Sequence, residues 1–543
     1  MSTEEALSNG KPPKDKTTHY LLINNTAHPT PTSFPVHSPS TNTHLYDFSS
    51  ADPTSTSHAI TTAHAAFPAW KALPQPQKRD IFLSAASILT SRLPALCATM
   101  SSETGASASW AAFDTNLAIQ ILLDVSGRLS SLVGSMPQTS SPGTSALVYR
   151  DPYGVVLAIA PWNAPHILGM RSLIYPLAAG NTVIFKAHEL CPLTHTALVT
   201  ALHDAGLPPG VLTLLAHAPA DAATVTRQLI EDPRVKKVNF TGSTGVGRLI
   251  AEMAAHVLKP CVLELGGKAP AIVWADADIE LAARECAVGA FLNAGQICMS
   301  TERIIVHEDV MAEFEKAFVS AVKEMGFDGD KVLINRASVV KNQGLVADAV
   351  AKGARLVHGS SSTSIPDQEQ NTSAPPSTSL SPHILLNPSP TSLIHTTESF
   401  GPTVSLYTTT SETSALSLAN DTEYGLSAAI FTQDLRRGLR MAAGIESGAV
   451  HINGMTVHDE TALPHGGMFL SFLPFFVFTL PLYHTPFLLL LLPPPQSSSM
   501  LIPPQTPNLT QPPPPGMKNS GYGRFGSAGL EEWVRTKTVT FKN

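Results

Sequence analysis

The chain has 543 residues, a length that suggests two or three domains rather than one small core. Its 35 basic and 42 acidic residues give a formal net charge of −7, which argues against a nucleic-acid partner because such a partner needs a concentrated basic patch. The five cysteines form no CxxC pair and no zinc-like spacing, so we expect free thiols, a reducing compartment and no metal site. The N-terminus lacks an apolar signal core, and a cytoplasmic location is therefore expected.

The first part of the chain is predicted to be a tail followed by helices. Residues 1–20 are polar and are interpreted as a disordered tail. From Ala59 to about Gly134, runs such as RDIFLSAASILTSRL space their apolar residues three and four apart. That spacing is typical of amphipathic helices.

After Gly134 the sequence pattern changes from helical spacing to short runs rich in Val, Ile and Leu. These predicted strands are Gly154–Ala160, Asn181–Ala187, Val211–Ala216 and Val235–Gly242. Helical stretches separate them, as at Thr194–Gly206 and Asp221–Asp232. Strand–helix alternation with apolar strands predicts an open α/β domain, a parallel sheet covered on both faces. A second α/β round begins at Ala269, and the low-complexity stretch Ser360–Pro382 is interpreted as a loop.

The segment FLNAGQICMSTERIIV contains a cysteine, Cys298, between a small glycine-containing segment and a predicted strand. A lone cysteine is more often a small buried apolar residue than a reactive one. Reactivity requires the thiolate and hence an electropositive or amide-lined site. The segment alone leaves both interpretations open.

The segment KPCVLELGGKAPAIV places a carboxylate, Glu264, at the end of an apolar strand. Burying a carboxylate is costly without a partner, so Glu264 is either an edge residue facing water or a general base in an environment that raises its pKa. The following Gly266 and Gly267 favour the base, since glycine permits close backbone approach to a ligand.

An asparagine, Asn163, follows the first predicted strand of the α/β region in PWNAP. The carboxyl edge of an open α/β sheet is where ligands bind. The amide of Asn163 could therefore donate to an oxyanion, although an asparagine after Pro-Trp is by itself only a turn residue.

The segment VNFTGSTGVG runs from a strand through a glycine loop into a helix. Amides from Ser243 to Gly247 would point at an anion at the helix N-terminus. The spacing is G-x-x-G-x-G rather than the dinucleotide fingerprint, so the signal is for a phosphate group in general. In FKAHE, Lys186 and Glu189 suit a ribose diol or phosphate, with a surface ion pair as the alternative.

Taken together and in this order, the segments resemble the aldehyde dehydrogenase superfamily. The matching stretches are PWNAP, FKAHE, FTGSTGVG, LELGGK, NAGQICMS, ESFGP and SGYGRFG, from about residue 20 to the C-terminus. The sequence of these segments is most similar to that of members that oxidise aromatic aldehydes of the salicylaldehyde, vanillin and benzaldehyde type. Aliphatic aldehydes and semialdehydes are the alternative substrates. A cysteine hydrolase is the rival class, but it needs a histidine partner for Cys298 and no motif nominates one.

The resemblance implies a role for each matching residue. Cys298 would be the nucleophile, Glu264 the base that activates the hydrolytic water, and Asn163 with the backbone N–H of Cys298 the oxyanion hole. The aldehyde would be oxidised to the acid through a thiohemiacetal and a thioester. NAD is expected because Glu189 would repel a 2′-phosphate, and NADP is the alternative. The implied cofactor-binding residues are Ile159, Trp162, Lys186, Glu189, Gly242, Ser243, Gly247, Leu265, Glu398 and Phe400.

The resemblance also implies how the chain is divided. Residues 21–141 and 153–266 would form the dinucleotide-binding domain and residues 267–468 the catalytic domain. Residues 142–152 and 527–543 would form a small β arm. Exposed strands of this kind pair between subunits, so a homodimer or homotetramer is expected.

Residues 469–517 form an apolar and proline-rich insertion. The run Phe469–Leu492 is long enough to cross a bilayer, which takes about 20 residues, but Pro474, Pro481 and Pro486 interrupt it. A membrane span is therefore not expected. Removing residues 469–517 joins the flanks as PHGGMKNSGYGRFG, so we interpret the insertion as an unspliced intron or gene-model error. The alternative is that the literal chain is inactive.

Overall fold

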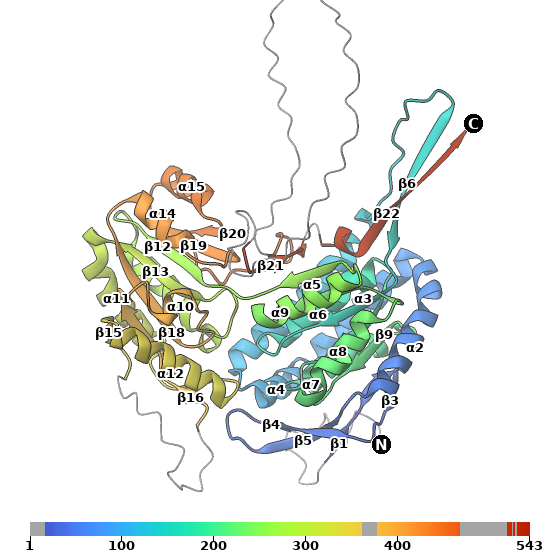
Figure 1. Cartoon of the computed structure of the whole chain (residues 1–543), viewed down its shortest axis with the longest axis horizontal. Helices are drawn as coiled ribbons and strands as arrows, with labels where there is room; N and C mark the ends of the chain where they lie inside the picture. The colour runs from blue at the N-terminus through green and yellow to red at the C-terminus, as the bar shows by residue number, and fades with distance from the viewer. Residues whose placement is uncertain (1–16, 361–376, 467–517, 524, 527–528, 543) are drawn as a thin grey trace, which may run out of the picture.

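The computed structural model describes residues 17–360, 377–466, 518–523, 525–526 and 529–542. These residues form two α/β units side by side, each built on one large open sheet (Figure 1). The fold class expected from the strand–helix alternation is confirmed. The predicted tail is wrong at its end, because Thr18–His19 form strand β1, which pairs with β5 (His44–Ser49). Residues 1–16 lie outside the described part of the chain.

The first sheet contains the four strands that the apolar runs predict. Its order is β21-β11-β10-β7-β8-β9-β2-β3. Strands β7 and β8 are buried at every position, as expected where helices cover both faces. The bounds in sheet order are Gly521–Tyr522, Cys261–Glu264, Val235–Thr241, Val155–Ile159, Thr182–Lys186, Leu212–Leu215, Leu21–Ile23 and Thr26–His28.

The five strands from β11 to β9 are parallel to one another. Their carboxyl ends therefore meet at one edge of the sheet, where open α/β sheets bind ligands. Helix α8 packs with α2 and α9, while α6 packs with α5 and α7. The helices of this unit are α2 (Pro53–Ala72), α3 (Gln75–Ser91), α4 (Leu93–Thr104), α5 (Ala108–Arg128), α6 (Pro165–Ala178), α7 (Pro192–Asp204), α8 (Ala222–Glu231) and α9 (Thr244–His256).

The second sheet follows five residues after Glu264, with the order β15-β17-β18-β13-β12-β19-β20. Alternate side chains of β12 enter different cores: Ala271 and Val273 pack on one face and Ile272 on the other. The strand bounds in sheet order are Arg355–His358, His383–Leu386, Thr403–Thr409, Thr301–His307, Ala269–Val273, Ser427–Phe431 and Ala449–Ile452. The helices are α10 (Ile279–Phe291), α11 (Met311–Glu324), α12 (Arg336–Ala351), α13 (Leu393–Thr396), α14 (Glu412–Asn420) and α15 (Leu435–Gly444).

Small sheets complete the fold. Strands β6 (Thr144–Pro152) and β22 (Val534–Lys542) pair antiparallel along their whole length and extend away from the body (Figure 1). Strand β4 (Ser33–His37) pairs with β5, and β14 (Lys331–Val332) pairs with β16 (Ser379–Leu380). The expectation of a loop at Ser360–Pro382 is thus wrong for β16, and residues 361–376 lie outside the described part.

The two flanks of the insertion meet in the folded chain. His465 and Phe525 form an antiparallel bridge, with the Phe525 N–H donating to the His465 carbonyl at 3.0 Å. Strand β21 then pairs with β11, and the Leu265 N–H donates to the Ser520 carbonyl. The insertion itself lies outside the described residues.

Among the described residues, no single helix is both long and apolar enough to cross a membrane. One pair, α3 and α4, satisfies length and composition together but is bent by 72°.

A fully buried arginine on β13, Arg303, holds the second unit together. It donates to the carbonyls of Leu418 at 2.8 Å and Ala419 at 2.7 Å, at the end of α14. Arg303→Met would leave buried carbonyls without a donor, at about 1–3 kcal/mol each, and we expect a clearly lower calorimetric melting temperature. Arg79→Met, at an exposed ion pair with Asp80, is the control and should shift the melting temperature little. Equal shifts in both variants would contradict this role.

Candidate active site

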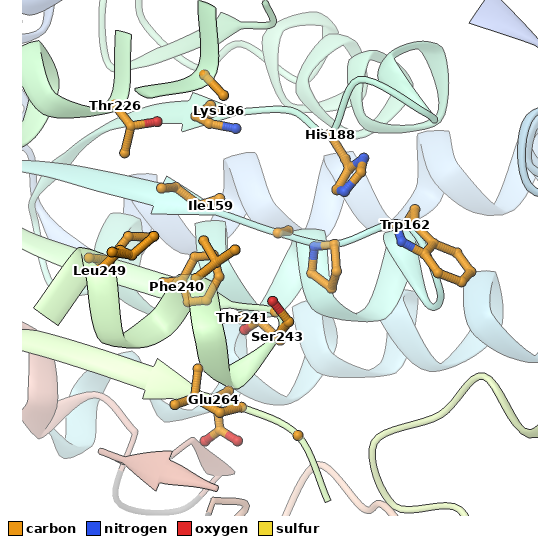
Figure 2. Close-up of a pocket in the computed structure, with 18 of the residues that line it drawn as sticks. Ile159, Trp162, Lys186, His188, Thr226, Phe240, Thr241, Ser243, Leu249 and Glu264 are labelled. Atoms are coloured by element: carbon orange, nitrogen blue, oxygen red, sulfur yellow. The ribbon is translucent and has the colours of Figure 1, made fainter. Parts of the chain in front are cut away.

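A cavity of about 1070 Å³ lies at the carboxyl edge of the first sheet, and residues of both α/β units line it. Ile159, Lys186, Thr241 and Glu264 are the last residues of β7, β8, β10 and β11. Figure 2 shows them along one wall in the order Lys186, Ile159, Thr241, Glu264, which is the order of strands β8, β7, β10 and β11 in the sheet. The parallel sheet therefore gathers residues that are distant in sequence.

The N-terminus of α9 lies at the wall of the cavity. Ser243 is its N-cap residue, yet among the described residues its side chain caps no amide of the helix. The first-turn amides and the Ser243 hydroxyl are therefore suited to bind an anion. Val246 and Leu249 on the same helix line the cavity although both are exposed, and they offer an apolar surface to a flat ring. Figure 2 shows Leu249 there.

The predicted pair Lys186 and Glu189 lines the same wall. Burial lowers the pKa of Lys186. Burial also opposes ionisation of Glu189, but nearby His188 and Lys186 outweigh it and lower its pKa. Glu189 is thus a carboxylate at neutral pH, with His188 Nδ1 3.4 Å from its Oε2.

Three of the predicted cofactor residues differ in what they contact. Gly242 and Leu265 line the cavity, whereas Gly247 does not. A Cβ on Gly247 would lie 2.4 Å from Leu265 Cδ2, so this glycine allows α9 to pack on Leu265. Its expected place in the phosphate loop stays a prediction, and the structure adds that Gly247 packs against a lining residue.

Cys298 follows a tight turn and lines the cavity. Asn293 and Ala294 adopt left-handed backbone conformations in the preceding 3₁₀ segment Leu292–Gly295. A Cβ on Gly267 would lie 2.0 Å from the Cys298 carbonyl oxygen. Gly267 therefore permits close approach of the Cys298 backbone, a role that the sequence did not suggest, while Gly266 lines the cavity.

Asn163 is held by three residues that the sequence did not single out. Its Nδ2 donates to the Gln296 carbonyl at 2.9 Å. Its own carbonyl accepts from Trp110 Nε1 and Asn293 Nδ2, both at 3.1 Å. Gln296 and Asn293 lie in NAGQICMS, so these bonds tie Asn163 to the cysteine segment. A side-chain amide has two N–H groups, which leaves one for a ligand in the cavity.

The surroundings of Cys298 are electronegative, contrary to what a reactive cysteine led us to expect. Burial first, then the charges of Glu264 and Glu398, raise the pKa of the Cys298 thiol to about 12. Glu264 itself is 4% exposed and lines the same cavity. Without a bound cation, Cys298 is a thiol at neutral pH.

The ESFGP segment is positioned by a buried ion pair. Glu302 lies 2.5 Å from Lys268 and accepts from the backbone N–H groups of Ser399 and Phe400. Glu398 accepts from the Gly267 N–H at 2.8 Å, and burial followed by the charge of Glu302 raises its pKa to about 7.

The aromatic residues predicted to bind the cofactor meet at the cavity. The Phe400 ring lies edge-on to Trp162 at 5.8 Å, and both line the cavity. The role of Glu302 and Lys268 was missed, because a charge pair twenty or more residues apart leaves no local pattern. Among the described residues, no group of three or more His, Cys, Asp or Glu could hold a metal ion.

The charge around Cys298 can be tested by alkylation of the cofactor-free protein. Glu264→Gln removes a negative charge, lowers the thiol pKa and so increases the thiolate fraction. We expect iodoacetamide to label Cys298 about 3- to 10-fold faster at pH 8, measured by peptide mass spectrometry. Glu308→Gln, at an exposed position, should leave the rate unchanged. Slower labelling of Glu264→Gln would mean that Glu264 instead deprotonates the thiol in the free protein.

Comparison with known proteins agrees with this geometry. A model of the aldehyde dehydrogenase family matches residues 26–474. A vanillin dehydrogenase from Pseudomonas fluorescens is 43% identical over 417 residues, covering 76% of this chain and 84% of the relative. A salicylaldehyde dehydrogenase from Pseudomonas putida is 37% identical over 418 residues, covering 75% and 84%.

A solved structure is similar over nearly the whole chain. The crystal structure of a salicylaldehyde dehydrogenase from Pseudomonas putida G7, complexed with salicylaldehyde, has a TM-score of 0.82 and 31% sequence identity, covering 97% of this chain and 98% of that one. The resemblance drawn from seven short segments is confirmed. The chain belongs to the aldehyde dehydrogenase family and is an oxidoreductase that acts on aldehydes.

Proposed function

We propose that this enzyme oxidises an aromatic aldehyde to its carboxylic acid with NAD, using Cys298, Glu264 and Asn163. The observation that carries the proposal is that these three side chains, from separate segments, line one cavity. The same cavity is lined by Lys186 and Glu189, the pair suited to a ribose.

The residues divide the chemistry between them. Cys298 Sγ adds to the aldehyde carbonyl, while Asn163 Nδ2 and the Cys298 N–H donate to the oxyanion. A bound oxidised nicotinamide supplies the hydride acceptor. Glu264 then takes a proton from water as the water attacks the thioester, and the acid leaves with Cys298 restored. No metal is needed in this scheme.

The electrostatics favour an ordered reaction. The thiol pKa of about 12 keeps Cys298 protonated in the free enzyme. A positive charge placed in the cavity favours the thiolate and lowers that pKa. We therefore expect Cys298 to react with the aldehyde only after the cofactor has bound.

NAD is favoured over NADP by the charge at Glu189. This carboxylate lines the cavity and has a lowered pKa, so it is ionised at neutral pH. It accepts hydrogen bonds from a ribose diol but repels a 2′-phosphate by Coulomb's law.

The free cysteines of the described chain also support a reducing compartment such as the cytoplasm.

The aromatic substrate class rests on the relatives, whose names specify vanillin and salicylaldehyde. The test is a panel of aromatic, aliphatic and semialdehyde substrates with each cofactor, following reduced nicotinamide at about 340 nm. We expect the highest kcat/KM for an aromatic aldehyde with NAD. A clear preference for an aliphatic aldehyde or semialdehyde would overturn the substrate assignment, and equal use of NADP would overturn the cofactor assignment.

Site variants test the chemistry itself. Cys298→Ala should abolish turnover while NAD still binds, and Asn163→Ala should lower kcat by about 10²–10³-fold because one oxyanion donor is lost. Calorimetric titration with NAD checks that each variant retains its cofactor site. Near-normal turnover of Cys298→Ala would defeat the proposed mechanism.

We infer further that the β arm mediates assembly into a homodimer or homotetramer. Strand β22 is exposed over nearly all its length, and Tyr149, Val539 and Phe541 present apolar surface on the paired strands. Large exposed apolar side chains on paired strands are typical of a surface that another chain covers.

Residues 469–517 are proposed to be dispensable. The flanks are already joined by the His465–Phe525 bridge, and Gly526 packs so closely on Leu463 that a Cβ there would lie 1.9 Å from the Leu463 carbonyl oxygen. A variant lacking 469–517 should therefore match or exceed the specific activity of the full chain and elute as a dimer or tetramer. Loss of folding in this variant would contradict the proposal. A spliced transcript that still encodes FLSFLPFF would overturn the intron interpretation.

A further inference from the structure

A row of charged side chains leads from Glu264 away from the cysteine. His465 Nε2 lies 3.8 Å from Glu264 Oε2, and His465 Nδ1 lies 3.6 Å from Asp459 Oδ1. Asp459 Oδ2 accepts a hydrogen bond from Arg171 Nη2 at 2.5 Å. An imidazole thus stands between two carboxylates, one of them the proposed base.

All four side chains are largely withdrawn from water. The side chains of Glu264 and Arg171 are each 5% exposed, and those of Asp459 and His465 are 11% and 12% exposed. Charges at such depth are retained only with partners, and their mutual interaction is stronger than at the surface. The slight exposure of His465 leaves a route to solvent from the ring.

Asp459 and Arg171, at the end of the row away from Glu264, are held in their charged forms. Burial opposes the charge of Asp459, but the positive charge of Arg171 lowers its pKa. Burial likewise opposes the charge of Arg171, and Asp459 raises its pKa above the ordinary value. The guanidinium also lies over the Phe525 ring at 5.5 Å, next to the bridge that carries His465. Asp459 is therefore a permanent anion beside Nδ1.

A fixed anion beside Nδ1 selects the ring tautomer. In the neutral ring, the proton is held on Nδ1, facing Asp459, and Nε2 is left as an acceptor facing Glu264. At 3.6 and 3.8 Å these are charge contacts rather than hydrogen bonds. Catalytic hydrogen bonds are often long in ligand-free enzymes and tighten in the complex.

We propose that His465, oriented by Asp459 and Arg171, accepts the proton that Glu264 takes from the hydrolytic water. The inference rests on the proposed role of Glu264. As water adds to the thioester, its O–C bond forms, the C–S bond breaks and Glu264 gains one proton. That proton moves from Glu264 Oε2 to His465 Nε2, and the imidazolium releases a proton to solvent. Glu264 is a carboxylate again for the next turnover, and no further reactant is needed.

His465 acts through Glu264 and is a positioning residue, not a catalytic one. Other ionisable groups contribute to the field around the row: Glu398 and Cys298 beside Glu264, and His458 and Tyr175 beside Asp459 and Arg171. In the described chain, His465 is the imidazole that contacts both carboxylates.

Stopped-flow measurement of nicotinamide reduction in the full chain tests the relay. In His465→Phe, whose ring fills the same space, we expect a burst of about one equivalent per site followed by a slow phase. The steady-state kcat should fall by about 10- to 100-fold with KM little changed, because deacylation is slowed and hydride transfer is not. Adding imidazole should restore turnover to His465→Ala but not to His465→Phe. His44→Phe removes a histidine–carboxylate contact at the surface and should leave kcat unchanged.

The outcomes separate this inference from the proposed function. A normal kcat in His465→Phe, a rise in KM alone, or loss of the burst would each overturn the relay, the second pointing to a substrate contact. Glu264→Gln should show the same burst with a still slower second phase. If Glu264→Gln turns over normally, the proposed base itself is wrong. If only His465→Phe is normal, the base stands and the relay fails.

Discussion

The close contact between the Gly267 backbone and the Cys298 carbonyl is the constraint on which the site depends. It lies where the chain leaves the last parallel strand of the first sheet and enters the second unit five residues after Glu264. Any side chain at Gly267 would force the Cys298 backbone to shift. Because the turn has no side chain, the proposed base and the proposed nucleophile line the same cavity, and the Gly267 N–H also holds Glu398. One small turn therefore joins the two sheets and the two halves of the chemistry.

The charges around this cavity suit the proposed order of reaction, in which Cys298 reacts only after the cofactor has bound. Burial and then the neighbouring carboxylates keep Cys298 protonated, and a protonated thiol is less readily oxidised or alkylated than a thiolate. The same negative field favours a bound cation, and in the proposed mechanism that cation activates the cysteine. An electropositive site would give a permanently reactive cysteine. In the proposed mechanism, this field makes the reactivity of Cys298 conditional on the cofactor, and Glu264 then needs a route by which it can release its proton.

The row of charged side chains Glu264, His465, Asp459 and Arg171 links the proposed base to the place where the C-terminal segment packs on the body of the protein. His465 reaches Glu264 from a backbone that pairs with Phe525, and Phe525 in turn lies against Arg171. Hence the flanks of the insertion are part of the environment of the proposed base. Their pairing explains how a family fold is retained although 51 positions between them lie outside the described chain (467–517).

The sequence by itself determined the α/β class, the strands around Ile159 and Lys186, and the family, because these depend on local apolar patterns and on short segments whose order is preserved. It also singled out Cys298, Glu264 and Asn163 as candidates. Only the tertiary structure decided that Gly247 packs under Leu265 and that the cysteine lies in a negative field. Contacts such as those of His465 with Glu264 and Asp459 join residues that have no common local pattern, since they arise from how the two units and the C-terminal segment pack, and no single segment encodes them.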